Sequence, residues 1–156
     1  MAEKTNAMRK LAAMKIAFTE HYYADTGAIA GADVARALGE DAARVFKTLV
    51  TVGKTGAHYV FLVPVEEELD LKKAAASVGE KSVEMIKSKE LLPLTGYIHG
   101  GCSPIGMKKF FRTVVHKTAA DFPTIYFSGG KIGLQIELPP EKLAEVIKFE
   151  YADIIR

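Results

Sequence analysis

Two apolar segments joined by a turn, FKTLVTVGKTGAHYVFLV at residues 46–63, lie in the first half of this sequence. The β-branched residues of Phe46–Val52 favour a strand, and Gly53–Gly56 is typical of a turn. The run Tyr59–Val63 is continuously apolar over the length of a strand, which predicts burial on both of its faces. The sequence therefore predicts two strands here, the second of them in the interior.

Helices and further strands are expected on both sides of this segment. Asp70 is expected to cap a helix over Leu71–Val78, and Gly79 to end it. The other expected elements are helices at Asn6–Lys15 and Asp33–Leu38, strands at Phe18–Tyr23 and Phe111–Val115, a hairpin at Thr124–Leu138, and a C-terminal helix opened by Pro139 and Pro140, with Leu143, Val146, Ile147 and Ile154 on one side. Because helices and strands mix without a regular βαβ alternation, the predicted fold class is α+β.

The predicted hairpin indicates which of its side chains are buried. A two-residue turn at Gly129-Gly130 would place Phe127 opposite Ile132, and Ile125 opposite Leu134. A second, polar face would then carry alternate residues, and because it contains a glycine, a ligand can lie close to its backbone. The core face would hold Ile125, Phe127, Ile132, Leu134, Ile136 and Leu138, and the polar face Tyr126, Ser128, Lys131, Gly133 and Gln135.

Composition excludes several classes of protein. The 156 residues are 49% apolar and 26% charged, which is close to the globular average and argues against disordered and fibrous proteins. No linker or repeat divides the chain, so one domain over residues 1–156 is expected. The start Met1–Lys4 lacks an apolar leader and no apolar run reaches 18 residues. A cytoplasmic protein without a membrane anchor is therefore expected.

The sequence lacks the cysteine, histidine and aspartate patterns that are typical of metal sites. The single cysteine, Cys102, excludes an internal disulfide and a zinc site built from cysteines. The four histidines show no i,i+4 pairing, and no Asp-x-Asp cluster is present. We therefore expect neither a bound metal nor a cofactor.

The segment Gly96–Gly106, GYIHGGCSPIG, has four glycines and a proline in eleven residues. Such a loop can direct several backbone N–H groups at one point, as in an anion site or an oxyanion hole, or it can be a tight structural turn. It is not a Walker A phosphate-binding loop, because no Gly-Lys-Ser/Thr follows, and it lacks the Gly-x-Gly-x-x-Gly dinucleotide fingerprint. Cys102 could be a nucleophile with His99 or His116 as its base, or a small buried thiol.

Charge is unevenly distributed along the chain. The net charge is +2, but the segment Tyr97–Gln135 carries +4 and the rest of the chain −2. This segment is either a groove for the phosphates of a nucleotide or RNA end, or a solvated basic face. Its charged residues are Lys108, Lys109, Arg112, Lys117 and Lys131 against Asp121. Lys47 lies in an apolar strand, where its ammonium either reaches solvent or binds a phosphate or carboxylate over a cleft.

Four segments of this chain, named below in their order along the sequence, resemble motifs of the YbaK/EbsC family of aminoacyl-tRNA deacylases. This family is related to the editing domain inserted in bacterial prolyl-tRNA synthetases. The resemblance runs from about Met14 to the segment Phe149–Ile154 and so covers most of the chain. The segments are Phe46–Leu49, Leu69–Lys73, Gly96–Gly106 with its Gly-Tyr-x-x-Gly-Gly-x-Ser-Pro-x-Gly pattern, and Ser128–Leu134.

This resemblance implies a fold and an activity. The fold would be a mixed, strongly curved sheet, partly closed like a barrel and flanked by helices. The activity would be trans-editing, the hydrolysis of cysteine mischarged onto proline tRNA. The implied partners are the aminoacylated 3′ end of that tRNA and prolyl-tRNA synthetase.

The resemblance also implies roles for individual residues. Lys47 would lie near the terminal nucleotide's phosphate or the ester, and the amides of Gly100 and Gly101 would face the scissile ester. These three are the catalytic candidates. The substrate-binding candidates are Tyr23, Ala30, Thr48, Ser103, Ser128, Gly129 and Gln135.

Two positions depart from the family pattern and keep alternatives open. Gln135 replaces the family's usual aspartate in the last strand, and Ala30 aligns with its usual pocket phenylalanine. The alternatives are deacylation of another small amino acid such as alanine, or a non-catalytic module that binds a nucleotide or a tRNA end. The nucleophile is either the substrate's own thiol or water.

Overall fold

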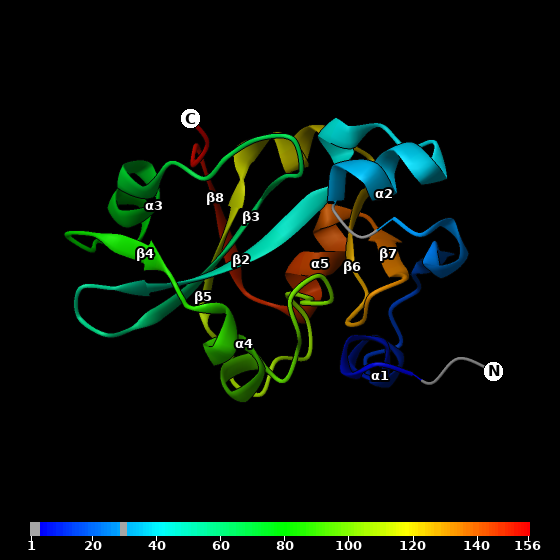
Figure 1. Ribbon diagram of the computed structural model, residues 1–156, viewed down its shortest axis with the longest axis horizontal. Coiled ribbons are helices and arrows are strands. Elements are labelled where there is room, and N and C mark those ends of the chain that lie inside the picture. Colours follow the sequence, from blue (N-terminus) through cyan, green and yellow to red (C-terminus); the bar gives the residue numbers. More distant parts are fainter. Residues whose placement is uncertain (1–3, 29–30) are drawn as a thin grey trace.

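The computed structural model describes residues 4–28 and 31–156, which form five α-helices and eight strands (Figure 1). In chain order these are α1 (Asn6–Ala13), β1 (Thr19–Tyr22), α2 (Gly31–Leu38), β2 (Phe46–Gly53), β3 (His58–Pro64), α3 (Leu71–Val78), β4 (Val83–Met85), α4 (Ser88–Thr95), β5 (Arg112–His116), β6 (Ile125–Ser128), β7 (Leu134–Leu138), α5 (Pro140–Val146) and β8 (Phe149–Ala152). Short 3₁₀ turns lie at Ala24–Thr26, Ala42–Arg44 and Lys117–Asp121. The α+β class is confirmed.

The strands form two sheets. One has the order β1-β7-β6, and the other the order β4-β2-β3-β5-β8. The second sheet is mixed, because β3 pairs antiparallel with β2 but parallel with β5, and β5 is parallel to β8. In Figure 1, β4 and α3 lie toward one end of the molecule and the β6–β7 hairpin toward the other, with β2 running between them. An isolated parallel bridge, Val45 to Tyr126, links the two sheets.

Strand β3 is buried on both faces, as its continuous apolar sequence predicted. Val60 and Leu62 pack into the core that the two sheets share, whose residues include Phe127 and Ile136. Phe61 and Val63 point to the other face and pack into a second core with α3. The alternation follows from the period of two along a strand.

The β6–β7 hairpin was predicted with the wrong register. Ile125 lies opposite Leu138 and Phe127 opposite Ile136, so the connection is longer than two residues. Ile132 lies in this connection and is exposed, not in the core. The register shift is an even number of residues, so no side chain of the strands changes face. Ile125, Phe127, Leu134, Ile136 and Leu138 are buried as expected.

The C-terminal segment also differs from the prediction. Helix α5 ends at Val146, and the chain then forms β8 beside β5, so Ile154 lies beyond a strand and not on a helix. Helix α4 and strand β4 were not expected. Pro93 within α4 removes a helical hydrogen bond, which weakens the helical signal of that segment.

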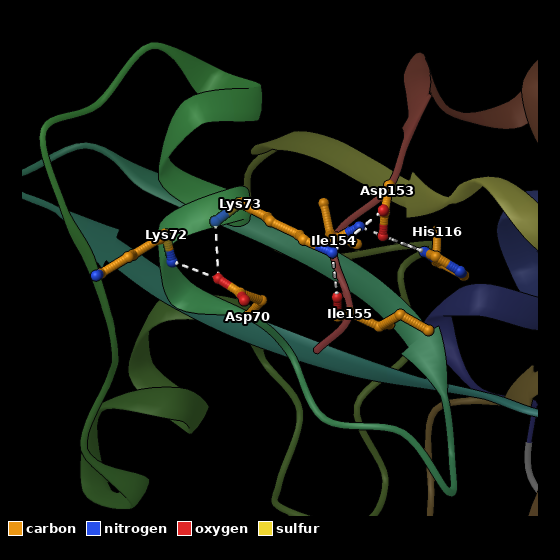
Figure 2. Close-up of polar contacts among 7 residues, drawn as sticks. All are labelled: Asp70, Lys72, Lys73, His116, Asp153, Ile154 and Ile155. Atoms are coloured by element: carbon orange, nitrogen blue, oxygen red, sulfur yellow. Dashed lines mark hydrogen bonds and ion pairs between the residues drawn. The ribbon is translucent and has the colours of Figure 1, made fainter.

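A set of polar contacts fixes the chain end, and Figure 2 shows it. We call Asp70, Lys73, His116 and residues 153–155 the C-terminal cluster. Asp70 caps α3 by accepting from the N–H groups of its first turn at 2.9 and 3.0 Å. Lys73 Nζ donates to Asp153 Oδ2 at 3.1 Å and to the Ile155 carbonyl at 2.9 Å. The Leu69–Lys73 motif therefore has a structural role here.

Candidate active site

A pocket of about 780 Å³ is lined by both sheets, by α2 and by the loop that follows α4. It brings together six of the residues that the sequence singled out, although they are far apart along the chain. These six are Tyr23, Lys47, Thr48, Gly100, Ser128 and Gln135.

The pocket follows an uncovered strand edge. Strand β4 pairs with β2 only at Thr51–Gly53, and β6 meets the chain only at the Val45–Tyr126 bridge, so Lys47–Leu49 has no paired strand on that side among the described residues. The Val50 carbonyl accepts from the Ile86 N–H at 3.3 Å and therefore points to this edge. Because main-chain groups of alternate residues point to the same edge, those of Thr48 face the uncovered side. The pocket wall thus offers main-chain donors and acceptors as well as side chains.

Lys47 and Thr48 carry polar groups that the protein leaves without partners. Among the described residues, the Lys47 ammonium makes no ion pair or hydrogen bond, although its side chain is half-buried. Thr48 Oγ1 is buried and has no hydrogen-bond partner in the same part of the chain. Buried polar groups are usually satisfied, so unpaired ones in a pocket indicate a place for a polar ligand.

The main-chain N–H groups of the glycine loop differ in whether another described residue accepts from them. Gly100 has a φ of +85°, a conformation that favours glycine, and its N–H has no partner among the described residues. The N–H of Gly101 instead donates to the Ile98 carbonyl at 2.9 Å. A Cβ at Gly101 would lie 2.9 Å from the Ile132 nitrogen, so glycine is required there for close packing on the β6–β7 turn. The geometry therefore favours Gly100 over Gly101 as an oxyanion donor.

Cys102 lines the pocket but is poorly suited to nucleophilic chemistry. Burial raises the pKa of its thiol to about 12, so the reactive thiolate is scarce at neutral pH. Of its two candidate bases, His116 belongs to the C-terminal cluster, where Nδ1 accepts from the Ile154 N–H at 3.4 Å. His99 is exposed and lines the pocket.

The other candidates lie behind or outside the pocket wall. Ser103 is fully buried, and its Oγ accepts from the Ile105 N–H at 3.3 Å. The N–H of Gly129 donates to the Leu134 carbonyl, and its carbonyl accepts from Thr5 Oγ1 at 2.5 Å. Both residues thus shape the segments that carry Gly100 and Ser128. Ala30 lies outside the described residues.

Comparison with known proteins decides the family. The profile of the aminoacyl-tRNA editing domain matches residues 27–146. The chain belongs to the aminoacyl-tRNA editing family. A relative from Enterococcus faecalis, EbsC, named as a candidate Cys-tRNA(Pro)/Cys-tRNA(Cys) deacylase, is 44% identical over 153 residues, which are 97% of this chain and 93% of EbsC.

Solved structures of similar proteins agree with this assignment. A crystal structure named as that of a candidate trans-editing enzyme for prolyl-tRNA synthetase has a TM-score of 0.85 and 25% identity, and covers 99% of each chain. The crystal structure of a hypothetical protein has a TM-score of 0.88 at 22% identity, covering 97% of this chain and 99% of its own, and supports the fold.

Gln135, the departure from the editing-family pattern, has a carboxylate beside it. With its amide nitrogen toward Glu40, Gln135 donates to Oε1 at 2.8 Å and to Oε2 at 2.9 Å. Burial raises the pKa of Glu40 to about 7. A second carboxylate at position 135 would repel Glu40, whereas an amide binds it. Sequence reasoning missed Glu40, which places a carboxylate in contact with the Gln135 amide.

A polar network extends from Gln135 along the same face of the hairpin. Glu137 Oε1 lies 2.7 Å from His21 Nε2, and Glu137 Oε2 accepts from Thr124 Oγ1 at 2.6 Å. Arg44 donates to the Thr124 carbonyl at 3.0 Å and lies over the ring of Tyr126. These contacts rigidify the strand that carries Gln135. The sequence alone did not indicate this network, because its residues come from four separate segments that meet only in the folded protein.

The charge of the segment Tyr97–Gln135 does not gather at the pocket. None of its five basic residues lines this pocket, whose lysines are Lys47 and Lys87. Arg112, for example, pairs with Glu150 at 3.0 Å. In residues 4–28 and 31–156, no group of three metal-binding side chains comes together, and no helix is long and apolar enough to span a membrane.

Proposed function

We propose that this chain is a trans-editing hydrolase that deacylates mischarged proline tRNA, with cysteine as the principal amino acid removed. The observation that carries the proposal is that Lys47 and Gly100 line the same pocket, and that neither the Lys47 ammonium nor the Gly100 N–H has a partner among the described residues. Family membership and the names of EbsC and of the solved trans-editing candidate support it. The proposed partners are the tRNA 3′ end and prolyl-tRNA synthetase, in the cytoplasm.

The proposed reaction needs stabilisation of charge more than a protein nucleophile. A nucleophile adds to the ester carbonyl, and the negative charge that develops on the oxygen is stabilised by the Gly100 N–H. The bond to the ribose oxygen then breaks, and the ribose oxygen takes a proton. Lys47 would hold the phosphate or ribose of the terminal nucleotide and so orient the ester.

Either of two nucleophiles, water or the thiol of the bound cysteine, gives a complete reaction. Water would give the free amino acid directly, its proton passing to the ribose oxygen. The thiol of a bound cysteine would displace the ribose oxygen and form a cyclic thioester, which water then opens. Cys102 is not proposed as the nucleophile, because its thiol is buried and burial raises its pKa.

The remaining candidates would bind substrate. We propose that Tyr23, Thr48, Ser128 and Gln135 contact the aminoacyl adenosine directly, and that Ser103, Gly129 and Gly101 act by shaping the wall. Alanine is the second candidate amino acid, because Gln135 and Ala30 differ from the family pattern. Selection by shape alone discriminates weakly between small side chains.

Two expectations about architecture belong to the same proposal. The Val45–Tyr126 bridge supports a reading in which the two sheets continue one strongly curved, partly barrel-like surface. The absence of a linker in the sequence supports one editing domain over residues 1–156.

A deacylation assay tests the proposal. Proline tRNA charged with cysteine, alanine or proline would be incubated with wild type, Lys47→Ala and, as a matched control, Lys72→Ala, an exposed lysine on α3. We expect wild type and Lys72→Ala to release cysteine fastest and proline slowest, and Lys47→Ala to be strongly impaired. If no charged tRNA is hydrolysed faster than in buffer, the enzyme proposal is wrong and a binding module remains.

A further inference from the structure

A second hollow, of about 520 Å³, lies where α1, the segment Pro104–Phe111 and the end of α5 meet. We call it the α1–α5 groove. Lys10, Lys109 and Lys148 line it from these three elements, and all three side chains are exposed. None of the three makes an ion pair with a described residue, and no acidic side chain lines the groove. The groove is therefore basic.

An aromatic ring stands among these lysines. Phe110 is 61% exposed, more than any other large apolar side chain in the described part of the chain. Phe111, its neighbour, also lines the groove and is packed against the shared core. An exposed ring next to several cations matches the surfaces that bind single-stranded nucleic acid, where bases stack on aromatic rings and lysines contact phosphates.

The groove and the active-site pocket share one loop. Gly100 and Cys102 line the pocket, and Pro104 and Gly106 line the groove. Because Pro104 is only two residues from Cys102, their Cα atoms are at most about 7 Å apart. The pocket and the groove therefore approach each other at this loop, whose residues 101–105 are buried.

From this placement we infer that the α1–α5 groove binds the single-stranded nucleotides that precede the terminal adenosine of the substrate. This inference rests on the proposed function, since it extends the same bound RNA beyond the pocket. Lysine is depleted at the core of protein–protein interfaces, so three lysines around the ring favour RNA over a protein partner. Phe110 stacks a base, and Lys10, Lys109 and Lys148 contact the phosphates.

The first test measures binding alone. The probe is a fluorescein-labelled six-nucleotide RNA that ends in a 3′ adenosine, and the readout is anisotropy across salt concentrations. We expect Phe110→Ala to weaken binding about tenfold and Phe110→Tyr to bind as wild type does, because both rings stack. Leu92→Ala, which removes a 51% exposed side chain on α4, is the matched control and should bind as wild type does.

Salt dependence tests the lysines. Replacing Lys10, Lys109 and Lys148 together with glutamine should reduce the slope of log K against log salt by about two, since each lost contact to single-stranded RNA removes about 0.7. The control replaces three exposed lysines elsewhere, Lys54, Lys72 and Lys81. Equal slopes for the two triple variants would overturn the inference.

Kinetics separate this inference from the proposed function. With cysteinyl-tRNA, Phe110→Ala should raise KM about tenfold and leave kcat unchanged, because uniform binding is lost. With cysteinyl-adenosine, which lacks the preceding nucleotides, the variant should equal wild type within twofold. If wild type hydrolyses neither substrate, the proposed function fails, while the oligonucleotide still tests the groove. If the substitutions weaken binding to prolyl-tRNA synthetase and not to RNA, the groove is a protein interface and the inference is wrong.

Discussion

The C-terminal cluster and the active-site pocket both gather polar residues from distant segments, but they differ in how those residues are satisfied. In the cluster, Lys73 has two partners, and its hydrogen bond holds the pKa of Asp153 below its ordinary value. In the pocket, Lys47 and Thr48 Oγ1 have none among the described residues. Both regions carry motifs that resemble the editing family. Between these two regions, the difference lies in the unsatisfied polar groups and not in the presence of a motif; Thr118 Oγ1, outside the pocket, is also buried without a partner among the described residues.

The largest expected effect lies in the structural region. Ile154 is fully buried beside the cluster, so Ile154→Ala should lower the free energy of unfolding by about 3 kcal/mol. Urea denaturation measures the loss, and Ile132→Ala, at an exposed position, should change it by less than about 0.5 kcal/mol. Folded Ile154→Ala should keep the wild-type kcat/KM within twofold. A large loss of activity per folded molecule would break the separation of the two regions.

The reverse pattern is expected for Lys47→Ala. Because no described residue depends on its ammonium, stability should stay within about 0.5 kcal/mol of wild type. The kcat/KM for cysteinyl-tRNA should fall about a hundredfold, which corresponds to about 2.7 kcal/mol of transition-state stabilisation. A marked loss of stability with full activity would place Lys47 with the structural residues.

Glu40 has a hydrogen-bonded partner, Gln135, but also a raised pKa, so its contribution to stability should depend on pH. Burial raises its pKa in the folded protein to about 7 from an unfolded value near 4.5, so the folded state binds more protons between these pH values. Its contribution to stability therefore falls as pH rises through that window. We expect Glu40→Gln to gain about 1 kcal/mol relative to wild type between pH 5 and pH 8, after allowing for solvent screening of a half-buried group. Urea midpoints at both pH values measure this gain, and an equal difference at both would contradict it.

The smallest effect is expected at Cys102. Its thiol is buried and protonated, so Cys102→Ala should leave kcat for cysteinyl-tRNA within about threefold of wild type. The main-chain geometry of the loop is retained because the substitution keeps the N–H. Single-turnover deacylation measures this, and loss of turnover would show that Cys102 takes part in the chemistry.

Much of the fold could be predicted because local signals were strong. The Asp70 cap and the Gly79 stop predicted both ends of α3 correctly. The apolar run of β3 predicted a buried strand, which is the middle strand of the five-stranded sheet. The hairpin register was wrong because Gly129-Gly130 looks like a complete two-residue turn, whereas the chain continues through Lys131–Gly133 before pairing resumes. Strand β8 was missed because its pairing partner, β5, is more than 30 residues away in the sequence.

The site could be predicted only in part. The family motifs indicated Lys47, Thr48, Gly100, Ser128, Gln135 and Tyr23, all of which line the pocket. They did not indicate that Gly101 is a packing residue, which depends on the approach of the β6–β7 turn. Nor did they indicate Glu40, whose relation to Gln135 exists only after the region around α2 and strand β7 come together. A charge count along the chain likewise placed basic residues in the segment that holds the loop, but not at the pocket.

The uncovered edge of β2 also bears on how this protein behaves at high concentration. An unpaired strand edge is a template on which another chain can add a strand, which leads to aggregation. Here the edge of Lys47–Leu49 lies in the wall of a pocket that residues of α2 and of the glycine loop also line. An incoming strand from a second molecule must enter that pocket to reach the edge, whereas the proposed substrate brings a single small aminoacyl group. Recessing the edge thus keeps its hydrogen-bonding groups available to a substrate while hindering self-association.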